Sequence, residues 1–488
     1  MSYLHGTYGE IGESVVTATE DVETAVVYVG TAPVNLIRGY ANAGIINTPV
    51  RLDNASAKNK IGYSTDYNMF TLSEVIDAHF NNPKGNIGPV YVINVLDPDI
   101  NRTEKKNVSL SFSNGKAEIE SDTIILDTLA LEDKTEGVDY SLSYSFATGK
   151  VLIASIGTAI EGSVNATYNE VTEVTETEII GGKTSDGVYT GIYAIERMYP
   201  VFGVVPVLFG CPKWSENKTV YQALVEKAQK LNGHWYAYVL ADIPIESTDT
   251  IDKAIAWKET NNYDSMYSKV CWPQVTRGTQ HYHLSTLAIV ELMRNDNEND
   301  GVPMGTCSNK TISCSAQYFG TASNQGFDIT DANILNAKGI TTVASWNGTY
   351  QIWGPHTAAF RAGEDGKAVP GIDMLAIFDS NIRVQEYILN SFQAEWGGYV
   401  DEPLTLGLRD MILEREQEKL DGLVAQGALI GSPTIEFLES ENTGEDILNG
   451  DFQWHFNDTP TPLGKSFTAK VVCTDAGFDT LLTTAEEE

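Results

Sequence analysis

Apolar residues form short uninterrupted runs near the start of the chain, and this pattern predicts buried strands. TAVVYVGTAP (24–33) and GPVYVINVLDP (88–98) are runs of this kind. Between them, TLSEVIDAHF (71–80) has apolar residues at helical spacing, and Thr71 followed three residues later by Glu74 indicates a capping box. A strand, a helix and a second strand in this order predict a parallel sheet that is covered on both faces.

The pattern changes between residues 100 and 181, where apolar and polar residues alternate with a period of two. VSLSFSNGKAEI and VDYSLSYSFATGKVLIAS show this alternation, which is typical of strands with one buried face. Asn114-Gly115 and the ATGK segment at 147–150 separate the runs, as expected of hairpin turns. We therefore predict an all-β module, a small sandwich or barrel, inserted into the α/β domain.

Helical and strand patterns alternate again after the insert, which predicts that the α/β core resumes there. The expected elements are helices at 185–200, 219–233, 249–261 and 283–296, and strands at 202–210, 235–244 and 268–275. Repeated units of this kind favour a doubly wound sheet as the core of the chain.

The last third of the chain predicts two long helices and little else that is regular. Residues 371–396 are expected to be helical over most of their length. A second helix is expected over 401–427, with Asp401 as its N-cap and Gly427 at its end. TIEFLES (434–440) has the pattern of a strand, so the domain that these elements form is expected to be α+β.

Both ends of the chain have too few apolar residues to form a core of their own, so we expect them to be extended arms. The complete division is an N-terminal arm (1–20), the first part of the α/β core (21–99), the inserted β module (100–181), the second part of the core (182–360), a C-terminal α+β polymerisation domain (361–464) and a C-terminal arm (465–488).

The charge of the chain excludes one large class of partners. Acidic residues number 66 against 32 basic ones, for a net charge of −34, whereas direct binding of nucleic acid needs clustered Lys and Arg. No apolar run approaches the ~20 residues of a membrane span, and the first residues lack the pattern of a secretory signal, so we expect synthesis in the cytosol and no membrane insertion. The five scattered cysteines are expected to be free thiols.

A search for catalytic and ligand-binding motifs finds none that is complete. GGKT at 181–184 has the second half of a phosphate loop, but the two positions where the first glycine could stand are Thr177 and Glu178. His281 and His283 would share a face if they lay in a strand, yet no third metal ligand lies near them in the sequence. We therefore predict no catalytic residue, no cofactor and no metal site.

Aromatic residues in the segment GITTVASWNGTYQIWGPHTAAF raise one further possibility. Trp346, Tyr350 and Trp353 could line a groove for a sugar, although alternating aromatics on adjacent strands more often pack across the strands. The Gly354-Pro355 break that follows is either the edge of a ligand pocket or the junction between two domains.

Several segments together resemble the sheath protein of contractile phage tails and related contractile injection machines. They are AVVYVGTAP, TLSEVIDAHFNN with GPVYVINVLD, VDYSLSYSFATGKV, GITTVASWNGTYQIWGPHT and VDEPLTLGLRDMILEREQEKLDGLVAQGALIGS. Their order and spacing cover nearly the whole chain. One departure is Pro355-His356, because the family often has Asn-Arg after the Trp-Gly turn. The resemblance favours the domain-junction interpretation of this segment, and it implies a core sheet likened to that of subtilisin, without that enzyme's catalytic residues.

The resemblance implies a structural protein without enzymatic activity or cofactors. Copies of such a protein form hexameric rings that stack helically around a tail tube, and contraction drives the tube through a target cell envelope. The implied partners are further copies of the chain, the tail tube protein, and baseplate and tail terminator proteins. The implied location is the bacterial host cytoplasm during synthesis and afterwards the virion tail or a released contractile particle, from a phage, a bacteriocin or another injection device.

Two sets of residues are the expected contact sites. The arms, which we expect to add strands to the C-terminal domains of neighbouring copies, contain Tyr3, Leu4, Tyr8, Ile11, Val15, Val16, Phe467, Ala469, Val471 and Val472. A tube contact is expected at Arg409, Arg415 and Lys419, although these could equally belong to a solvated helix face with ion pairs along it.

Two alternatives stay open. The first is a carbohydrate-binding or adhesive virion protein that acts through the inserted β module. The second is a cytosolic α/β hydrolase whose catalytic site the motifs do not reveal.

Overall fold

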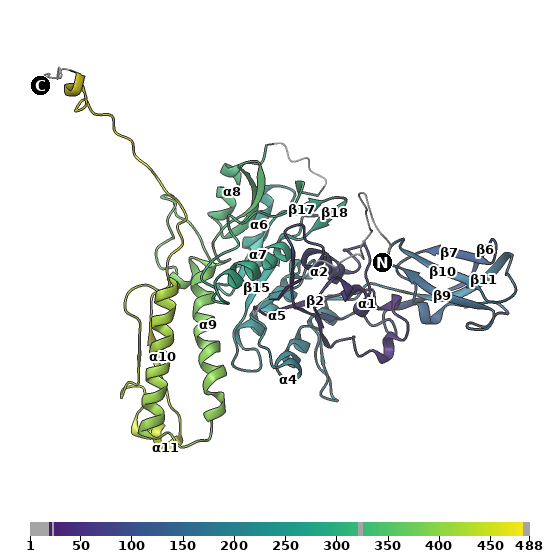
Figure 1. The fold of residues 1–488 in the computed structure, drawn as a ribbon, viewed down its shortest axis with the longest axis horizontal. Coiled ribbons are helices and arrows are strands. Elements are labelled where there is room, and N and C mark those ends of the chain that lie inside the picture. Colours follow the sequence, from purple (N-terminus) through teal and green to yellow (C-terminus); the bar gives the residue numbers. More distant parts are fainter. Residues whose placement is uncertain (1–18, 22–23, 321–325, 482–488) are drawn as a thin grey trace, which may run out of the picture.

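The computed structural model describes residues 19–21, 24–320 and 326–481 of the chain. The molecule is elongated, with the inserted β module at one end, the α/β core in the middle and two long helices at the other end (Figure 1). The last described residues run away from this body as an extended tail.

The core is an eight-stranded sheet in which six central strands run parallel and the two edge strands are antiparallel. In spatial order its strands are β21 (Thr349–Trp353), β20 (Ile340–Trp346), β16 (Ser268–Cys271), β15 (Tyr238–Asp242), β14 (Leu208–Gly210), β2 (Val26–Gly30), β5 (Val90–Asn94) and β3 (Pro49–Leu52). Every residue of β2, β5 and β15 is buried. Successive residues of a strand point to opposite faces, so both faces of the sheet are covered, as the apolar runs predict.

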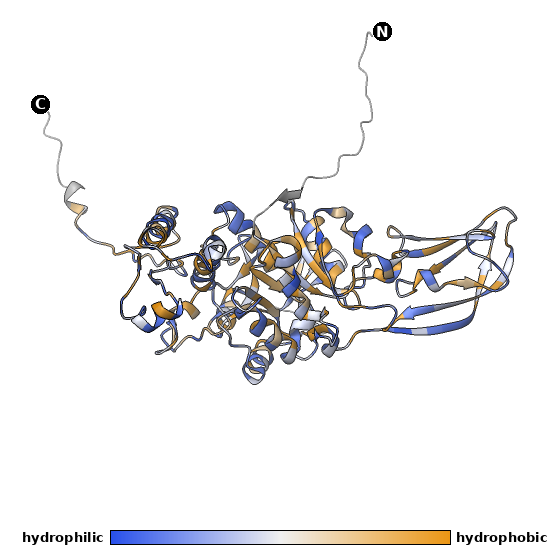
Figure 2. Cartoon of the chain, turned by 90° about the horizontal axis from the view of Figure 1, so that it is seen from below, coloured by the Kyte–Doolittle hydropathy of each residue, from blue (hydrophilic) through white to orange (hydrophobic). Residues whose placement is uncertain are grey.

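Helices cover this sheet, and its strands form the most hydrophobic part of the molecule (Figure 2). The helices of the core are α1 (Lys58–Ile61), α2 (Thr71–Phe80), α3 (Glu176–Ile180), α4 (Met198–Phe202), α5 (Lys218–Gln229), α6 (Ile251–Asn261), α7 (Leu284–Glu298) and α8 (Ile329–Asn336). Short strand pairs flank the sheet: β1 (Thr19–Asp21) with β4 (Asn86–Gly88), β12 (Gly182–Lys183) with β13 (Tyr189–Thr190), and β17 (Gln274–Arg277) with β18 (Gln280–Tyr282) and β19 (Ala316–Tyr318).

The predicted helix at 185–200 is wrong over residues 185–190, and most of the rest is a 3-10 helix in place of an α-helix. The chain there forms the β12–β13 pair and a 3-10 helix at Gly191–Arg197, and only then the short helix α4. Gly191 has a φ of 57°, and a Cβ at this position would lie 2.3 Å from the carbonyl oxygen of Ile179. The chain therefore makes a turn that only glycine permits, and this turn prevents a continuous helix.

The inserted segment forms two three-stranded antiparallel sheets. One has the order β7 (Lys116–Glu120), β10 (Lys150–Ser155), β9 (Tyr140–Ser145), and the other the order β6 (Arg102–Phe112), β11 (Gly162–Val171), β8 (Ala130–Leu131). Buried residues of both sheets, among them Leu110 and Val151, form an apolar cluster separate from that of the core. Arg38 of the core forms ion pairs with Asp127 and Glu136 of the insert, at 3.2 and 2.7 Å, which tie the two parts together.

The C-terminal part consists of α9 (Asp379–Trp396), α10 (Leu406–Gln426), α11 (Gly444–Asn449) and a two-stranded sheet of β22 (Thr434–Glu436) and β23 (His455–Asn457). Asp401 is not the N-cap of the second long helix. Thr405 takes that position, and its side chain accepts a hydrogen bond from the Leu408 amide. Asp401 instead has a φ of 69° in the turn between the helices, a backbone conformation outside any helix. The predicted strand at 434–440 is limited to its first three residues.

Candidate functional site

The strand order of the core points to one place where a ligand could bind. From β2 the chain continues to β5 on one side of β2 and later returns to β14 on the other side. Ligands of doubly wound sheets bind beyond the carboxyl ends of the strands at such a reversal.

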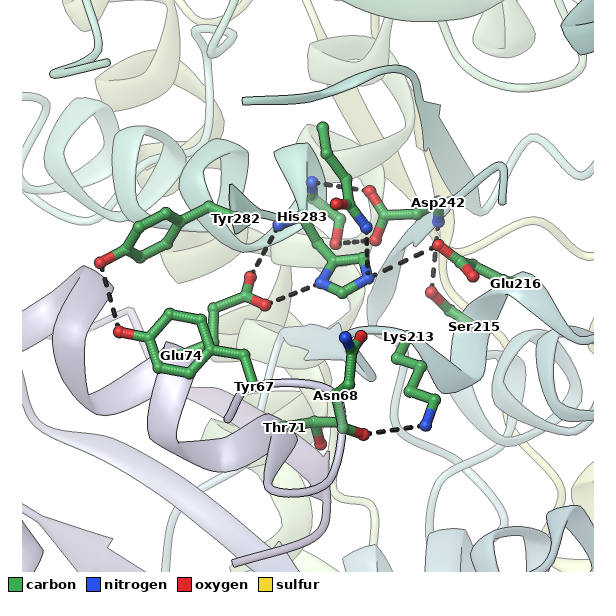
Figure 3. A network of polar contacts seen from close by, with 12 residues as sticks. Tyr67, Asn68, Thr71, Glu74, Lys213, Ser215, Glu216, Asp242, Tyr282 and His283 are labelled. Atoms are coloured by element: carbon green, nitrogen blue, oxygen red, sulfur yellow. Dashed lines mark hydrogen bonds and ion pairs between the residues drawn. The ribbon is translucent and has the colours of Figure 1, made fainter. Parts of the chain in front are cut away.

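A buried histidine and two glutamates fill this crevice (Figure 3). The backbone amide of His283 donates to Glu74 Oε1 at 2.9 Å, and its Nδ1 lies 2.7 Å from Glu74 Oε2. Its Nε2 lies 3.5 Å from Glu216 Oε1 and 3.1 Å from the Gln274 amide. Burial alone would lower the pKa of His283, but the Glu74 and Glu216 carboxylates raise that pKa well above its ordinary value. The ring is therefore a buried cation held between two anions.

Glu74 also shows why the predicted capping box is wrong. Helix α2 does begin at Thr71, but Phe70 is its N-cap and has no capping side chain, and the Thr71 amide donates to the Thr31 hydroxyl instead. The Glu74 carboxylate turns instead into the core, where it binds the amide that opens helix α7. Because a buried charged His283 needs an anionic partner, Glu74 pairs with His283 and does not cap the start of α2.

Asp242, at the end of β15, occupies the remaining side of the crevice. It accepts hydrogen bonds from the amide and the hydroxyl of Ser285 in the first turn of α7. Burial raises the pKa of Asp242 to about 7, although His283 beside it acts in the opposite direction. The first amides of α7, which could bind a phosphate, are thus occupied by the carboxylates of Glu74 and Asp242.

The crevice contains the residue types of a hydrolase but not their geometry. Catalysis of that kind needs a serine on one ring nitrogen of the histidine and an acid on the other. Here the two nitrogens of His283 face Glu74 on one side and Glu216 and Gln274 on the other, while the Ser285 hydroxyl binds Asp242. This arrangement joins β15, α2 and α7 into one rigid unit and leaves no activated nucleophile on His283.

The two histidines of the QHYHLS segment do not lie together. The ring of His281 stacks on Tyr318 with 3.6 Å between the ring centres, away from the His283 cluster. Within the part of the chain that the structure describes, no group of three His, Cys, Asp or Glu residues could hold a metal ion. The same residues include no helix that is long and apolar enough to cross a membrane.

The segment TYQIWGPHT forms the second strand of a hairpin and then the passage from the core to the C-terminal helices. The rings of Trp346 and Trp353 stack on the same face of the hairpin, 5.7 Å apart, which is cross-strand packing. His356 is buried against Phe360, and burial lowers the pKa of its ring to about 4.

A buried lysine ties this passage to both neighbouring domains. Lys269 of β16 donates to the carbonyl oxygens of Gly354 and His356 at 2.8 and 3.1 Å, and it forms an ion pair of 2.9 Å with Asp379 at the start of α9. The side chains of Lys269 and Asp379 have no exposed surface. These contacts define a domain junction.

The three cations expected to contact a tail tube are all in ion pairs within the chain. Arg415 and Lys419 of α10 both reach Glu395 of α9, at 2.9 and 2.5 Å, and Arg409 pairs with its neighbour Asp410 at 2.6 Å. Two of the three therefore link the long helices to each other. A role for them in tube contact stays a prediction.

The two-stranded sheet β22–β23 is the part of the C-terminal domain that could accept another strand. Ile435 pairs with Phe456. The outer edge of β22 is occupied by Gln417 of α10, which accepts a hydrogen bond from the Ile435 amide and donates one to the Pro433 carbonyl. Among the described residues, the outer edge of β23 has no neighbouring strand and is therefore open. Open edges present unpaired amides and carbonyl groups to a further chain.

The C-terminal tail is the other unusual feature of this part of the molecule. Phe467, Val471 and Val472 are 93%, 92% and 65% exposed, and Ala469 is exposed as well. The tail contains no strand within the described residues, so the strand-like run at its start is unpaired in the single chain. The N-terminal arm residues Tyr3, Leu4, Tyr8, Ile11, Val15 and Val16 lie outside the described residues.

These features define a class of protein before any relative is considered. The ligand position of the core is filled by buried charges, while an open sheet edge and an uncovered apolar tail lie on the outside. These features favour a structural role over a catalytic one and are suited to contacts with other chains.

Comparison with known proteins shows which proteins this chain resembles. No family model matches the chain. The tail sheath protein of Burkholderia phage BcepMu is 26% identical over 486 residues, which cover 95% of each chain. The tail sheath protein of Escherichia phage P2 is 26% identical over 331 residues, covering 64% of this chain and 76% of the relative. The chain is thus similar to phage tail sheath proteins over nearly its whole length, and the predicted resemblance is confirmed.

Solved structures agree in fold. The sheath complex of an extracellular contractile injection system in its contracted state has a TM-score of 0.54 over 98% of this chain and 99% of the other, at 12% identity. A chain of the anti-feeding prophage baseplate has a TM-score of 0.51 over 97% of this chain and 100% of the other, at 13% identity. The homologous tail sheath proteins are structural proteins and not enzymes, which confirms the prediction of a non-enzymatic structural protein.

Proposed function

We propose that this protein is the subunit of a contractile tail sheath whose copies form hexameric rings, stacked helically around a tail tube. The relatives that are most informative here are a sheath complex in the contracted state and a six-fold symmetrised baseplate. The partners in this proposal are further copies of the chain, the tube protein, and baseplate and tail terminator proteins. Synthesis takes place in the bacterial cytoplasm, and the protein then becomes part of a virion tail or a released contractile particle.

The observation that carries the proposal is an extended apolar tail beside an open sheet edge. The exposed side chains of Phe467, Val471 and Val472 find no cover in their own chain. A strand of this kind gains main-chain hydrogen bonds and apolar contacts when it joins the β22–β23 sheet of another copy. The N-terminal arm has the same role in the proposal.

Contraction in this proposal needs no nucleotide. The buried contacts of Lys269 and His283 hold each core rigid, and the arms keep neighbouring copies linked while the rigid bodies slide and rotate. New contacts between cores in the shorter form supply the free energy. About 2–3 kcal/mol for each subunit, summed over a long tube, would be sufficient to drive the tube through an envelope, since interface energies add over many copies. The subtilisin-like description of the core stays part of this proposal.

Electron microscopy of the full-length protein, expressed alone and with its tube protein, tests the proposal. We expect hollow tubes whose end views have six-fold symmetry, with wider and shorter tubes after a contraction trigger. Particles that stay single copies at every concentration, with or without the tube protein, would contradict it. The alternative of an adhesive protein predicts instead that the β module binds glycans and that no tubes form.

A further inference from the structure

An apolar groove of the C-terminal domain lies at the turn between the two long helices. It has a volume of about 720 Å³. Its walls come from the end of α9, the start of α10 and the segment after α11, and they include Phe392, Trp396, Leu404, Leu408, Phe452 and Trp454. Mostly apolar walls with a few polar groups are typical of a binding groove.

Two features show that this groove lacks a partner in the single chain. Val400, which lines the groove, is 71% exposed, and Leu406 in the first turn of α10 is 73% exposed, so both are large apolar side chains without cover in the described part of the chain. The indole nitrogen of Trp454 is buried and has no hydrogen-bond acceptor among the described residues. An occupant that supplies apolar side chains and a backbone carbonyl would satisfy both.

The chain has one segment with the matching chemistry. The tail ends in a 3-10 helix at Phe478–Leu481. Residues three apart in such a helix lie on the same side, so the side chains of Phe478 and Leu481 form one apolar knob. They are 65% and 83% exposed. In its own chain the tail leaves the body at the end of the helix pair opposite α11 and points away from the groove (Figure 1).

We infer that the Phe478–Leu481 knob of one copy docks in the α9–α10 groove of a neighbouring copy. This inference rests on the proposed function and adds to it a second, separate contact of the tail beyond the strand that joins the β22–β23 sheet. The occupant is therefore the tail of a second copy of this chain, held by the burial of two large side chains.

The charges around the groove predict the salt dependence of this contact. Asp401 and Glu402 lie at the groove, and Asp475 and Asp479 lie in the tail, so both partners are acidic. Apolar burial holds them together while like charges repel. Screening by salt is therefore expected to strengthen the contact, in contrast to a contact that depends on ion pairs.

Chemical cross-linking of the full-length chain tests the inference. Cys473 is an exposed thiol in the tail, while Cys211, Cys271 and Cys307 are buried. With Val400→Cys at the groove, a short bifunctional maleimide is expected to join copies into dimers and longer ladders on a denaturing gel. The matched control is Ile334→Cys on α8, an exposed apolar position of the core, which should give at least tenfold fewer ladders.

Removal of the knob completes the test. Phe478→Ser with Leu481→Ser, in the Val400→Cys chain, is expected to reduce the ladders about tenfold or more, because two buried apolar side chains are lost. Cross-links within single chains only, ladders that persist without the knob, or ladders equal to those of Ile334→Cys would overturn the inference. Tubes seen by electron microscopy without groove ladders would refute this contact and leave the sheath proposal intact, whereas an absence of tubes would refute that proposal itself.

Discussion

Lys269 and Asp379 form the most deeply buried ion pair of the domain junction. Lys269 Nζ has three further acceptors, in Thr341, Gly354 and His356, so the cation is fully paired. Lys269→Met would leave Asp379 as a buried charge without its main partner. We expect a loss of about 3–5 kcal/mol in the free energy of unfolding, measured with urea. Lys269→Met with Asp379→Leu should recover most of this loss, and a double variant as unstable as the single one would contradict the argument.

Glu386 is expected to carry a proton at neutral pH. The seam between α9 and the core buries Asp296, Asp379 and Glu386 but only two cations, Lys269 and Arg383. Burial raises the pKa of Glu386 from 4.5 to about 8, although Arg383 acts in the opposite direction.

Glu386 should therefore contribute to the pH dependence of the stability of the chain. Between pH 4.5 and about 8 the folded chain binds a proton that the unfolded chain has lost, so stability falls as pH rises and levels off above the folded pKa. Relative to Glu386→Gln, the wild-type chain should lose up to about 1.4 kcal/mol for each pH unit in this window. Thermal unfolding of both chains at several pH values checks this, and parallel curves would refute it.

At the scale of single residues, little of this could be predicted from the sequence. Thr71 and Glu74 have the spacing of a capping box, yet Glu74 binds His283, which is 209 residues later in the chain. Likewise, the acid that pairs with Lys269 lies in a different domain. Pairings of this kind depend on how distant elements meet, and local spacing contains no information about that.

At the scale of elements, Glu395 joins α9 to α10 through Arg415 and Lys419. The Glu395 side chain is 28% exposed, and the side chain of its partner Arg415 is 57% exposed. Exposed pairs contribute little, so Glu395→Gln is expected to change the free energy of unfolding by less than about 1 kcal/mol. A larger loss in urea unfolding would show that these pairs hold the helices together.

The same helix allows a direct test of the predicted tube contact. Arg409 is paired only with its neighbour Asp410, so Arg409→Glu should leave folding unchanged. If α10 faces the tube, this variant should bind tube protein more weakly than wild type in co-sedimentation, with Lys367→Glu, an exposed position outside the helices, as the control. Equal binding by all three chains would remove Arg409 from the predicted contact.

Elements with a regular spacing of apolar residues were predicted well, whereas elements whose bounds depend on backbone geometry were not. The apolar runs of β2 and β5 and the spacing of α5 and α6 identify these elements with errors of a few residues at their ends. The prediction for 185–200 fails because Gly191 turns the chain, and the start of α10 shifts because Asp401 lies in a turn with a positive φ, so that Thr405 becomes the N-cap. The spacing of hydrophobic residues contains no information about either effect.

At the scale of the whole molecule, the structure separates a rigid body from its tail. The core is joined to the insert through Arg38 and to α9 through Lys269 and Arg383, all by ion pairs. Residues 466–478 and 481, in contrast, contribute exposed side chains, and no strand lies in this part of the described chain. The elongated body is therefore suited to move as one piece, with the tail as the link to other copies.

The sequence could predict that the tail exists but not where it docks. Its low content of apolar residues shows that it forms no core of its own. Its short run of alternating apolar and polar residues predicts a strand that pairs with another chain. The groove beside Trp396 and Trp454 is formed by residues from three separate segments, so only the assembled structure reveals it.

Electron microscopy of a chain that ends at residue 465 tests the central claim that the tail links copies into a sheath. Because the tail makes few contacts with its own body, we expect this chain to fold with the stability of wild type but to form no regular tubes with the tube protein. A chain that lacks only residues 486–488 is the control and should form normal tubes. Regular tubes of the chain ending at residue 465, indistinguishable from those of wild type, would contradict the claim.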